Sequence, residues 1–339
     1  MIISYILKRI LLAVFTLLII LLVSYTLLRL APGDPTKSDM FSGESGTISR
    51  QDGVVKENLA LKKELNLDKP IITGFILWLN DVCHGNFGRS ASVDPGKDVL
   101  QLIGERAGLT IKLNLWAILI TYLLAIPIGV FSAAKAGSAA DRASEIILFI
   151  LYSLPVMWVG LLLQSLLCEG GKFPLLPLAG AEPDNALELS VWQYFAAEFR
   201  HLLLPVLCMA YGGLAGLSRY TRNSVLQNLN SDFIRTARAK GVSTGTVLWK
   251  HAFRNALITM ITLLSGILPS LISGSIIVEY IFNLLGMGTL SLLALSSRDY
   301  PLQMALFAIT GALTLTGILI SDLLYMAVDP RIKVDKTAK

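Results

Sequence analysis

Long apolar stretches separated by polar segments set the pattern of this chain. Six of them cover residues 9–29, 113–133, 145–167, 201–218, 256–281 and 302–326. About twenty mainly apolar residues let a helix cross the hydrocarbon core of a bilayer, so each stretch predicts a membrane-spanning helix. Gly212, Gly213 and Gly216 dilute the hydrophobicity of the fourth. The pattern therefore predicts an all-α membrane protein with six transmembrane helices.

Lysine and arginine are spread unevenly over the connections between these stretches. If the N-terminus is cytoplasmic, the short outer loops hold only Lys172, Arg200 and Arg298. The inner segments then hold Lys8, Arg9, Lys135, Arg142, Arg222, Arg235, Arg238, Lys240, Lys250, Arg254, Arg331, Lys333, Lys336 and Lys339. Because cytoplasmic loops carry the excess of basic residues, both termini are predicted to lie inside.

Spans and orientation together divide the chain into regions. They are an N-terminal transmembrane helix (1–30), a long outer loop (31–112), a domain of five spans (113–326) with a cytoplasmic loop at 219–254, and a cytoplasmic tail (327–339). The first stretch is longer than a signal-peptide core and no small-residue cleavage site follows it, so it is predicted to stay uncleaved. Within the outer loop, the apolar run 71–79 is too short to cross a bilayer and predicts a surface-lying or packed helix.

Composition agrees with a membrane protein and excludes several function classes. Of the 339 residues, 54% are hydrophobic and 16% charged, whereas soluble domains carry about 25% charged residues. The net charge of +5 is scattered over loops, which argues against a nucleic-acid partner and for membrane lipid as the surroundings. The cysteines and histidines are dispersed, without the spacing of a metal site.

Enzyme signatures are missing from the sequence as well. A Walker A loop needs Ser or Thr after Gly-Lys, but Phe173 follows Gly171 and Lys172. Neither a His-Glu-x-x-His nor a Gly-x-Ser-x-Gly pattern occurs. The chain is therefore predicted to bind no cofactor or metal and not to be an enzyme by itself.

The loop 219–254 carries the most informative polar pattern. Ser231 or Asp232 caps a short helix that runs to Lys240, and Gly241 supplies the left-handed residue that ends it. A second helix follows a cap at Ser243 and covers residues 244–254. The product is an elbow of two helices, residues 232–254, joined at a glycine.

Each arm of this elbow is predicted to have one packed face. In the first arm Arg235 and Arg238 share one face, and Phe233 and Ala237 share the opposite face. The buried stripe of the second arm is predicted to be Val247, Leu248 and His251. Taken alone, the pattern fits either a positively charged loop that happens to be helical or a docking site for another protein.

The residues of the elbow resemble a known family. Arg235-Thr236-Ala237-Arg238-Ala239-Lys240-Gly241, followed by Trp249-Lys250-His251-Ala252-Phe253-Arg254-Asn255-Ala256, closely resembles the coupling loop of ABC importer permeases, in the variant of dipeptide and oligopeptide permeases. In that family the loop docks into the ATP-hydrolysing subunit. The resemblance implies that the coupling residues here are Asp232, Phe233, Arg235, Thr236, Ala237, Arg238, Ala239, Lys240, Gly241, His251 and Arg254.

Further segments extend the resemblance over nearly the whole chain. They are residues 28–35, 65–70, 85–90, 279–282, 286–288, 298–301, 322–325 and 329–331. The sequence departs from the family pattern at Asn66 and Asn86, where Gly and Asp are usual, and at Leu285, where Pro is frequent. The ordered set of segments is specific, although each one alone is weak.

The resemblance implies an ATP-driven importer of dipeptides or oligopeptides that works by alternating access in the bacterial plasma (inner) membrane. The implied partners are a second, homologous six-span permease, two ABC ATPase subunits that use ATP and Mg, and an extracytoplasmic solute-binding protein. Nickel or another small solute is the alternative cargo. A self-sufficient secondary transporter is the alternative mechanism, but it calls for internal repeats and intramembrane ionisable residues, and the sequence shows no repeat.

A few polar residues in the spans are candidates for the translocation path. Glu279 lies near the outer end of span five, four residues after Ser275, and a carboxylate there is costly unless it faces water or a partner. Thr310 and Thr314 lie on one face of span six. The alternatives are an interfacial glutamate capped by water and small residues that allow close helix packing.

Overall fold

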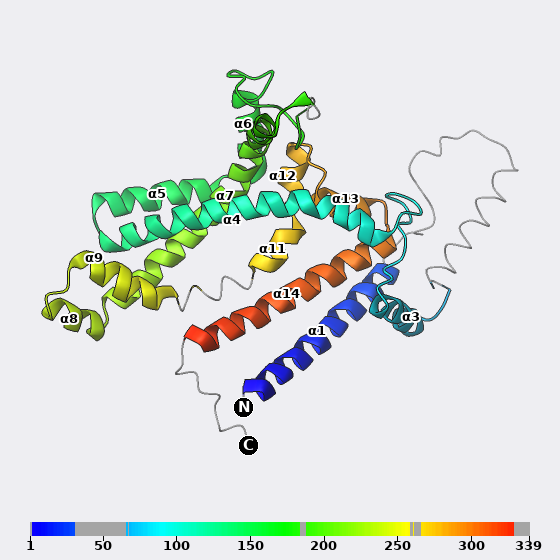
Figure 1. Ribbon diagram of the computed structural model, residues 1–339, viewed down its shortest axis with the longest axis horizontal. Helices are drawn as coiled ribbons and strands as arrows, with labels where there is room; N and C mark the ends of the chain where they lie inside the picture. The colour runs from blue at the N-terminus through cyan, green and yellow to red at the C-terminus, as the bar shows by residue number, and fades with distance from the viewer. Residues whose placement is uncertain are drawn as a thin grey trace, which may run out of the picture. The chain divides into compact units, whose positions relative to one another are not determined.

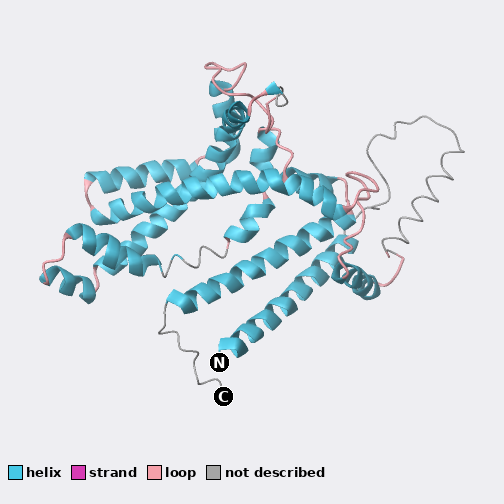
Figure 2. Ribbon diagram, in the orientation of Figure 1, coloured by secondary structure: helices cyan, strands magenta, loops and turns pink. Residues whose placement is uncertain are grey.

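The computed structural model describes residues 2–30, 66, 68–183, 188–257, 260 and 266–328. In this part of the chain all regular elements are helices, joined by loops that contain two isolated β-bridges, Arg89 with Asp98 and Cys168 with Leu176 (Figures 1 and 2). Most of the predicted outer loop before residue 68, and the tail from residue 329, lie outside the described residues. The predicted helical class is confirmed.

The chain forms two compact units. Unit 1 contains the described residues of Met1–Gly108 and Leu290–Leu315, and unit 2 those of Leu109–Thr289 and Thr316–Lys339. Three helices contribute to both units: α4 (Val99–Ala134), α13 (Met287–Ser296) and α14 (Tyr300–Val328).

Unit 1 is built on α1 (Ile2–Leu30) and the first half of α14, which run side by side (Figure 1). The helix predicted at 71–79 is present as α3 (Ile71–Cys83), and it packs on α1. Their shared core holds Leu21, Tyr25, Phe75, Met304 and Ala308. Of the two predicted alternatives, the structure shows the packed helix.

Asp299 fixes the loop that leads into α4. One oxygen of this fully buried carboxylate accepts hydrogen bonds from the Ser90 hydroxyl at 2.5 Å and from the backbone N–H groups of Ala91, Ser92 and Val93 at 3.0–3.1 Å. A carboxylate that accepts several backbone N–H bonds is well satisfied inside protein. Two sequence segments that resemble the family, 85–90 and 298–301, therefore meet in unit 1.

Unit 2 surrounds the second half of α4. It adds α5 (Ala139–Ser153), α6 (Val156–Leu167), the long α7 (Val191–Leu229), α11 (Ile267–Ser273) and α12 (Ile276–Ile281). The elbow adds α8 (Asp232–Ala239), α9 (Thr244–Thr246) and the π-helix η2 (Val247–Phe253). One buried cluster joins α4, α7 and α12 through Leu113, Leu204 and Val278.

Four described helices are long and apolar enough to cross a membrane, at Ile6–Leu30, Val99–Ala134, Val191–Leu229 and Tyr300–Leu324. A fifth candidate is the pair α5 and α6, bent by 93°. The predicted span 145–167 is therefore not one continuous helix. Pro155 bars its neighbour from the α region, and Leu154 is extended with φ −81° and ψ 126°, so the helix breaks there.

The ends of the helices also differ from the predicted spans. α4 begins at Val99, inside the predicted outer loop, because the Asp98 carboxylate accepts the N–H groups of Leu100 and Gln101. α7 covers Val191–Leu229, well beyond the predicted 201–218, and begins with a capping box of Ser190 and Gln193. Part of the predicted span 256–281 lies outside the described residues.

Candidate functional site

The first arm of the elbow has the ends that the sequence predicts. Ser231 is the N-cap residue of α8, and Gly241 follows the C-cap with φ +77°. The N–H of Val242 donates to the carbonyl of Ala237 at 3.2 Å, which closes the last turn. The elbow therefore changes direction at a glycine, where a left-handed backbone carries little strain.

The packed face of α8 is not the predicted one. Ile234 is fully buried and Ala237 is buried, but Phe233 is 42% exposed. The buried pair is Ile234 and Ala237, three residues apart, whereas the predicted pair was Phe233 and Ala237, four residues apart. Both spacings bring two side chains to one face of a helix, and Ile234 lies 100° around the axis from Phe233. Arg235 and Arg238 are both exposed, as predicted.

The second arm is wound as a π-helix, which moves its buried stripe. Val247 and Ala252 are buried and lie five residues apart, the i to i+5 repeat of a π turn. Leu248 and His251, predicted from an α-helical repeat, are half-buried. Trp249 is exposed and its ring meets Phe253 edge-on, with centroids 5.3 Å apart.

Both arms pack on two long helices of unit 2. One buried cluster joins the elbow to these helices. It contains Val130 and Ala133 of α4, Val225 of α7, and Ile234 and Val247 of the elbow. Burying an aliphatic side chain of this size contributes about 1.5–3 kcal/mol. The elbow is thus fastened to α4 and α7 and is not a free loop.

The opposite side of the elbow is basic and exposed. Its exposed cations are Arg235, Arg238, Lys240, Lys250 and Arg254. Within the described part of the chain, these cations form one ion pair. It joins Arg235 to Asp232 at 3.4 Å, and the two side chains are 78% and 95% exposed. Such a pair contributes little, so the surface keeps its positive charge.

A buried ion pair lies in the same unit. Arg222 of α7 donates to both carboxylate oxygens of Asp141, at 2.8 and 2.7 Å. Asp141 also accepts hydrogen bonds from the Ser132 hydroxyl and from the N–H of Gly137. The second bond is 2.8 Å long. In the sequence, Arg222 stood out only as a basic residue of the inner loop. The spacing Ser138-x-x-Asp141 is typical of the start of a helix, and it was the available signal that Asp141 has a structural role.

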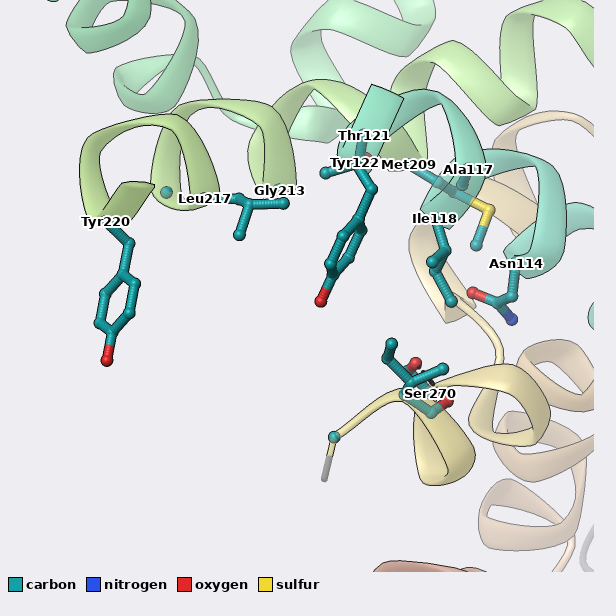
Figure 3. Close-up of a pocket in the computed structure, with 13 residues that line it drawn as sticks. Asn114, Ala117, Ile118, Thr121, Tyr122, Met209, Gly213, Leu217, Tyr220 and Ser270 are labelled. Carbon is teal, nitrogen blue, oxygen red and sulfur yellow. Dashed lines mark hydrogen bonds between the residues drawn. The ribbon is translucent and has the colours of Figure 1, made fainter. Parts of the chain in front are cut away.

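A cavity of about 420 Å³ opens between α4, α7 and α11 (Figure 3). Figure 3 shows Tyr122 and Tyr220 projecting in the same direction from different helices, with Asn114 and Ser270 at the other end of the group. The residues that line it are Asn114, Ala117, Ile118, Thr121, Tyr122, Met209, Gly213, Gly216, Leu217, Tyr220, Gly266, Ile267 and Ser270. None of these residues is charged. None was predicted from the sequence to form a site, because the cavity depends on how distant helices pack.

Glu279 and Ser275 are not among the residues that line this cavity. Glu279 is 1% exposed, and its oxygens accept from the Thr110 hydroxyl at 3.2 Å, the N–H of Thr289 at 2.8 Å and the N–H of Ser275 at 3.3 Å. Neither water nor a membrane interface is needed to satisfy the carboxylate. The arrangement ties α12 to α4 and to the start of α13.

Thr310 and Thr314 are half-buried in α14. The Thr314 hydroxyl donates to the carbonyl of Thr310 at 2.8 Å, one turn back in the same helix. Neither residue is among those that line the cavity. Their hydroxyls are compatible with close helix packing, which was the alternative interpretation of the sequence.

Within the described residues, no group of three or more His, Cys, Asp or Glu side chains is placed to hold a metal ion. None of the residues that line the cavity carries a carboxylate, an amine, a guanidinium, an imidazole or a thiol. What the arrangement offers is a helical frame, an uncharged cavity and an exposed basic elbow fastened to the same two helices.

Two family models match the sequence. The model described as "Binding-protein-dependent transport system inner membrane component" matches residues 125–334, and the model described as "Binding-prot-dependent transport system membrane comp, N-term" matches residues 2–113. Together they take in the helices of both units.

Similar proteins of known description match over almost their whole length. The "Oligopeptide transport system permease protein AppB" of Bacillus subtilis is 38% identical, over 97% of this chain and 99% of that protein. The "Peptidoglycan transport system permease protein YejB" of Agrobacterium fabrum is 31% identical, over 98% and 99%. The "Inner membrane ABC transporter permease protein YejB" of Escherichia coli O157:H7 is 33% identical, over 97% and 98%.

These matches agree with the helical frame and with the apolar helices that are long enough to cross a bilayer. A family model that covers most of the chain establishes membership. The chain belongs to the family of binding-protein-dependent transport system inner membrane components and is a multi-pass permease of the inner membrane.

Proposed function

We propose that the chain is the membrane-spanning permease subunit of an ATP-driven importer of dipeptides or oligopeptides. The proposal of a peptide cargo rests on the relative of Bacillus subtilis described as an oligopeptide permease. An uncharged cavity supports it, because peptides of different side-chain charge need a path that repels neither sign.

The proposed topology has six spans with both termini in the cytoplasm. The four long apolar helices and the bent pair α5–α6 supply five of them. The stretch 256–281, which contains α11 and α12, supplies the sixth. Residues 31–112 would then lie outside and residues 219–254 inside, with the basic elbow in the cytoplasm as the distribution of Lys and Arg requires.

One observation carries the proposed mechanism. The two helices on which the elbow packs, α4 and α7, are the same helices that supply most of the cavity wall. A protein that grips the exposed side of the elbow, Asp232 to Gly241 with His251 and Arg254, would therefore act on the cavity through rigid helices. Two ABC ATPase subunits that close on ATP and Mg are the proposed source of this motion.

The remaining partners follow from the same scheme. A second six-span permease, homologous but different in sequence, would complete the path, and an extracytoplasmic solute-binding protein would deliver the cargo. We place the path along the cavity, past Tyr122 and Tyr220. The candidates from the sequence, Ser275, Glu279, Thr310 and Thr314, lie outside the lining of this cavity.

The test is ATP-dependent peptide uptake into proteoliposomes that contain the whole complex. Charge reversal with Arg235→Glu and Arg238→Glu, or Gly241→Trp at φ +77°, is expected to abolish uptake and leave membrane insertion intact. Gly245→Ala is the matched control, since a Cβ at Gly245 meets nothing within 4 Å and the position is helical. Wild-type uptake in both elbow variants would reject the coupling role.

A further inference from the structure

A second hollow of unit 2 lies outside the proposed path. It is a groove of about 560 Å³ between α5 and α7, lined by Arg142, Glu145, Ile146, Phe149, Arg219 and Asn223. The two helices are antiparallel, because the Tyr211 hydroxyl donates to the carbonyl of Leu154 at 2.8 Å while Arg222 pairs with Asp141 further along. This register places Arg142 level with Asn223, and Arg219 about one turn deeper, level with Glu145.

The groove has an excess of positive charge. Glu145 is 3.3 Å from Arg222 and so already has a cationic partner. Arg142 donates to the carbonyl of Gly137 at 3.2 Å. Among the described residues, neither Arg142 nor Arg219 pairs with a carboxylate. Two guanidinium groups therefore face the groove without an anion.

The deeper part of the groove is apolar. Ile146 and Phe149 are 59% and 58% exposed. Phe149 lies two turns beyond Arg142 on α5, about 10 Å along the helix axis. The predicted spans begin at residue 145 and end at residue 218, which puts both arginines at the bilayer surface and Phe149 in the hydrocarbon.

We propose that this groove binds an anionic phospholipid. Arg142 and Arg219 would contact its phosphate, and Ile146 and Phe149 would line its first acyl chain. Basic pockets between membrane helices recognise acidic head groups in this way, and the arginine stems reach the surface by snorkelling. Free phosphate matches only the basic half of the groove, whereas a phospholipid also covers the exposed Phe149 ring.

The site adjoins the ion pair that holds α5 to α7. Glu145 lines the groove and contacts Arg222, whose other partner is Asp141. A bound phospholipid would add a further link between the two helices, so it is expected to raise the thermal stability of the protein. The inference depends on residence in a membrane and not on which cargo is moved.

The test uses the full complex, purified in mild detergent, stripped of lipid and titrated with dioleoylphosphatidylglycerol. Bound lipid is counted by native mass spectrometry. The wild type is expected to bind phosphatidylglycerol in preference to dioleoylphosphatidylcholine. Removing both charges with Arg142→Gln and Arg219→Gln should weaken the binding about 30-fold, since each cation near an acidic head group contributes about a factor of five.

Two controls separate the groove from general electrostatics and from a free anion. Lys135→Gln with Lys250→Gln removes the same charge from exposed positions elsewhere in unit 2 and should leave the affinity unchanged. Phe149→Ser should weaken the binding of phosphatidylglycerol but not that of glycerol phosphate.

Each contrary result overturns the proposal. If the wild type binds the two lipids equally, the proposal is rejected before any variant is tested. If the double arginine variant keeps the full affinity for phosphatidylglycerol, the proposal is rejected as well. Displacement of the lipid by glycerol phosphate at equal concentration would show a site for a free anion. No lipid bound to the full complex would show that a partner subunit covers the groove.

Discussion

Individual carboxylates of this protein are satisfied by the protein itself. Glu279 is held by α4 and the start of α13, and a Cβ on Gly288 would lie 3.0 Å from its carboxylate. Asp299 is held by the N–H groups of a loop, and Asp141 by Arg222. A buried carboxylate is costly unless its oxygens accept hydrogen bonds. Each of these groups therefore fixes how two segments of the chain meet, which is a structural role.

The Asp141→Asn variant tests this role for the buried pair with Arg222. The exposed fraction of the Asp141 side chain is 2% and that of Arg222 is 18%. Breaking a buried pair leaves an uncompensated charge, so the free energy of unfolding should fall by about 3–5 kcal/mol. Thermal or denaturant unfolding in detergent measures the change.

Glu145→Gln is the matched control for that variant. Glu145 contacts the same arginine at 3.3 Å, but 47% of its side chain is exposed. An exposed pair contributes about 0–1 kcal/mol, so the control should unfold close to the wild type. Equal losses in the two variants would mean that burial does not set the strength of this pair.

At the scale of elements, α4 and α7 are held unusually close at Gly129. A Cβ at this position would lie 2.5 Å from the carbonyl oxygen of Ser218 and 2.7 Å from the Cβ of Thr221. Small residues permit such an approach between membrane helices. The contact lies between the cavity and the residues on which the elbow packs, Val130 and Val225.

Gly129→Ala is therefore expected to destabilise the protein by about 1–3 kcal/mol, since the backbones of α4 and α7 must move apart. It should also reduce peptide uptake per ATP hydrolysed, because the same helices connect the elbow to the cavity. Gly104→Ala serves as the control on the same helix. A Cβ there meets nothing within 4 Å, and the greater helix propensity of alanine should leave stability unchanged or raise it by up to about 1 kcal/mol. Equal stability of the two variants would contradict the close approach.

Which elements the sequence predicts correctly depends on how local their cause is. The ends of α8 follow from Ser231 and Gly241, and the helix at Ile71–Cys83 follows from its own apolar run. Pro155 is itself a local signal for the bend between α5 and α6, but a hydropathy pattern takes no account of it. The packed face of α8 is set by its neighbours on α4 and α7. A prediction from the helical repeat alone therefore placed Phe233 on the buried face, where the structure has Ile234.

The candidate site shows the same division. The coupling segment 232–241 is contiguous in the sequence, so its resemblance to the family could be recognised from the residues themselves. The cavity is assembled from positions as far apart as Asn114 and Ser270, and the ion pair joins Asp141 to Arg222. Local periodicity carries no information about such pairings, which arise only when distant helices pack.

At the scale of the whole molecule, the proposed topology makes a prediction that native cysteines can test. Cys83 is exposed at the end of α3, in the region proposed to lie outside, whereas Cys168 and Cys208 are buried. A membrane-impermeant maleimide added to intact spheroplasts should therefore label Cys83 alone. A Cys83→Ser variant should take up no label, and this loss of labelling would identify Cys83 as the labelled site.

The opposite side is tested by placing a cysteine on the exposed elbow in that Cys83→Ser background. Lys250→Cys lies on η2, where the side chain is exposed, and should react only after the membrane is permeabilised. Labelling is compared at one fixed pH, because the thiolate is the form that reacts. Labelling of Lys250→Cys in intact spheroplasts, or protection of Cys83 there, would reverse the proposed orientation. It would also remove the elbow from reach of any cytoplasmic ATPase, and with it the proposed coupling.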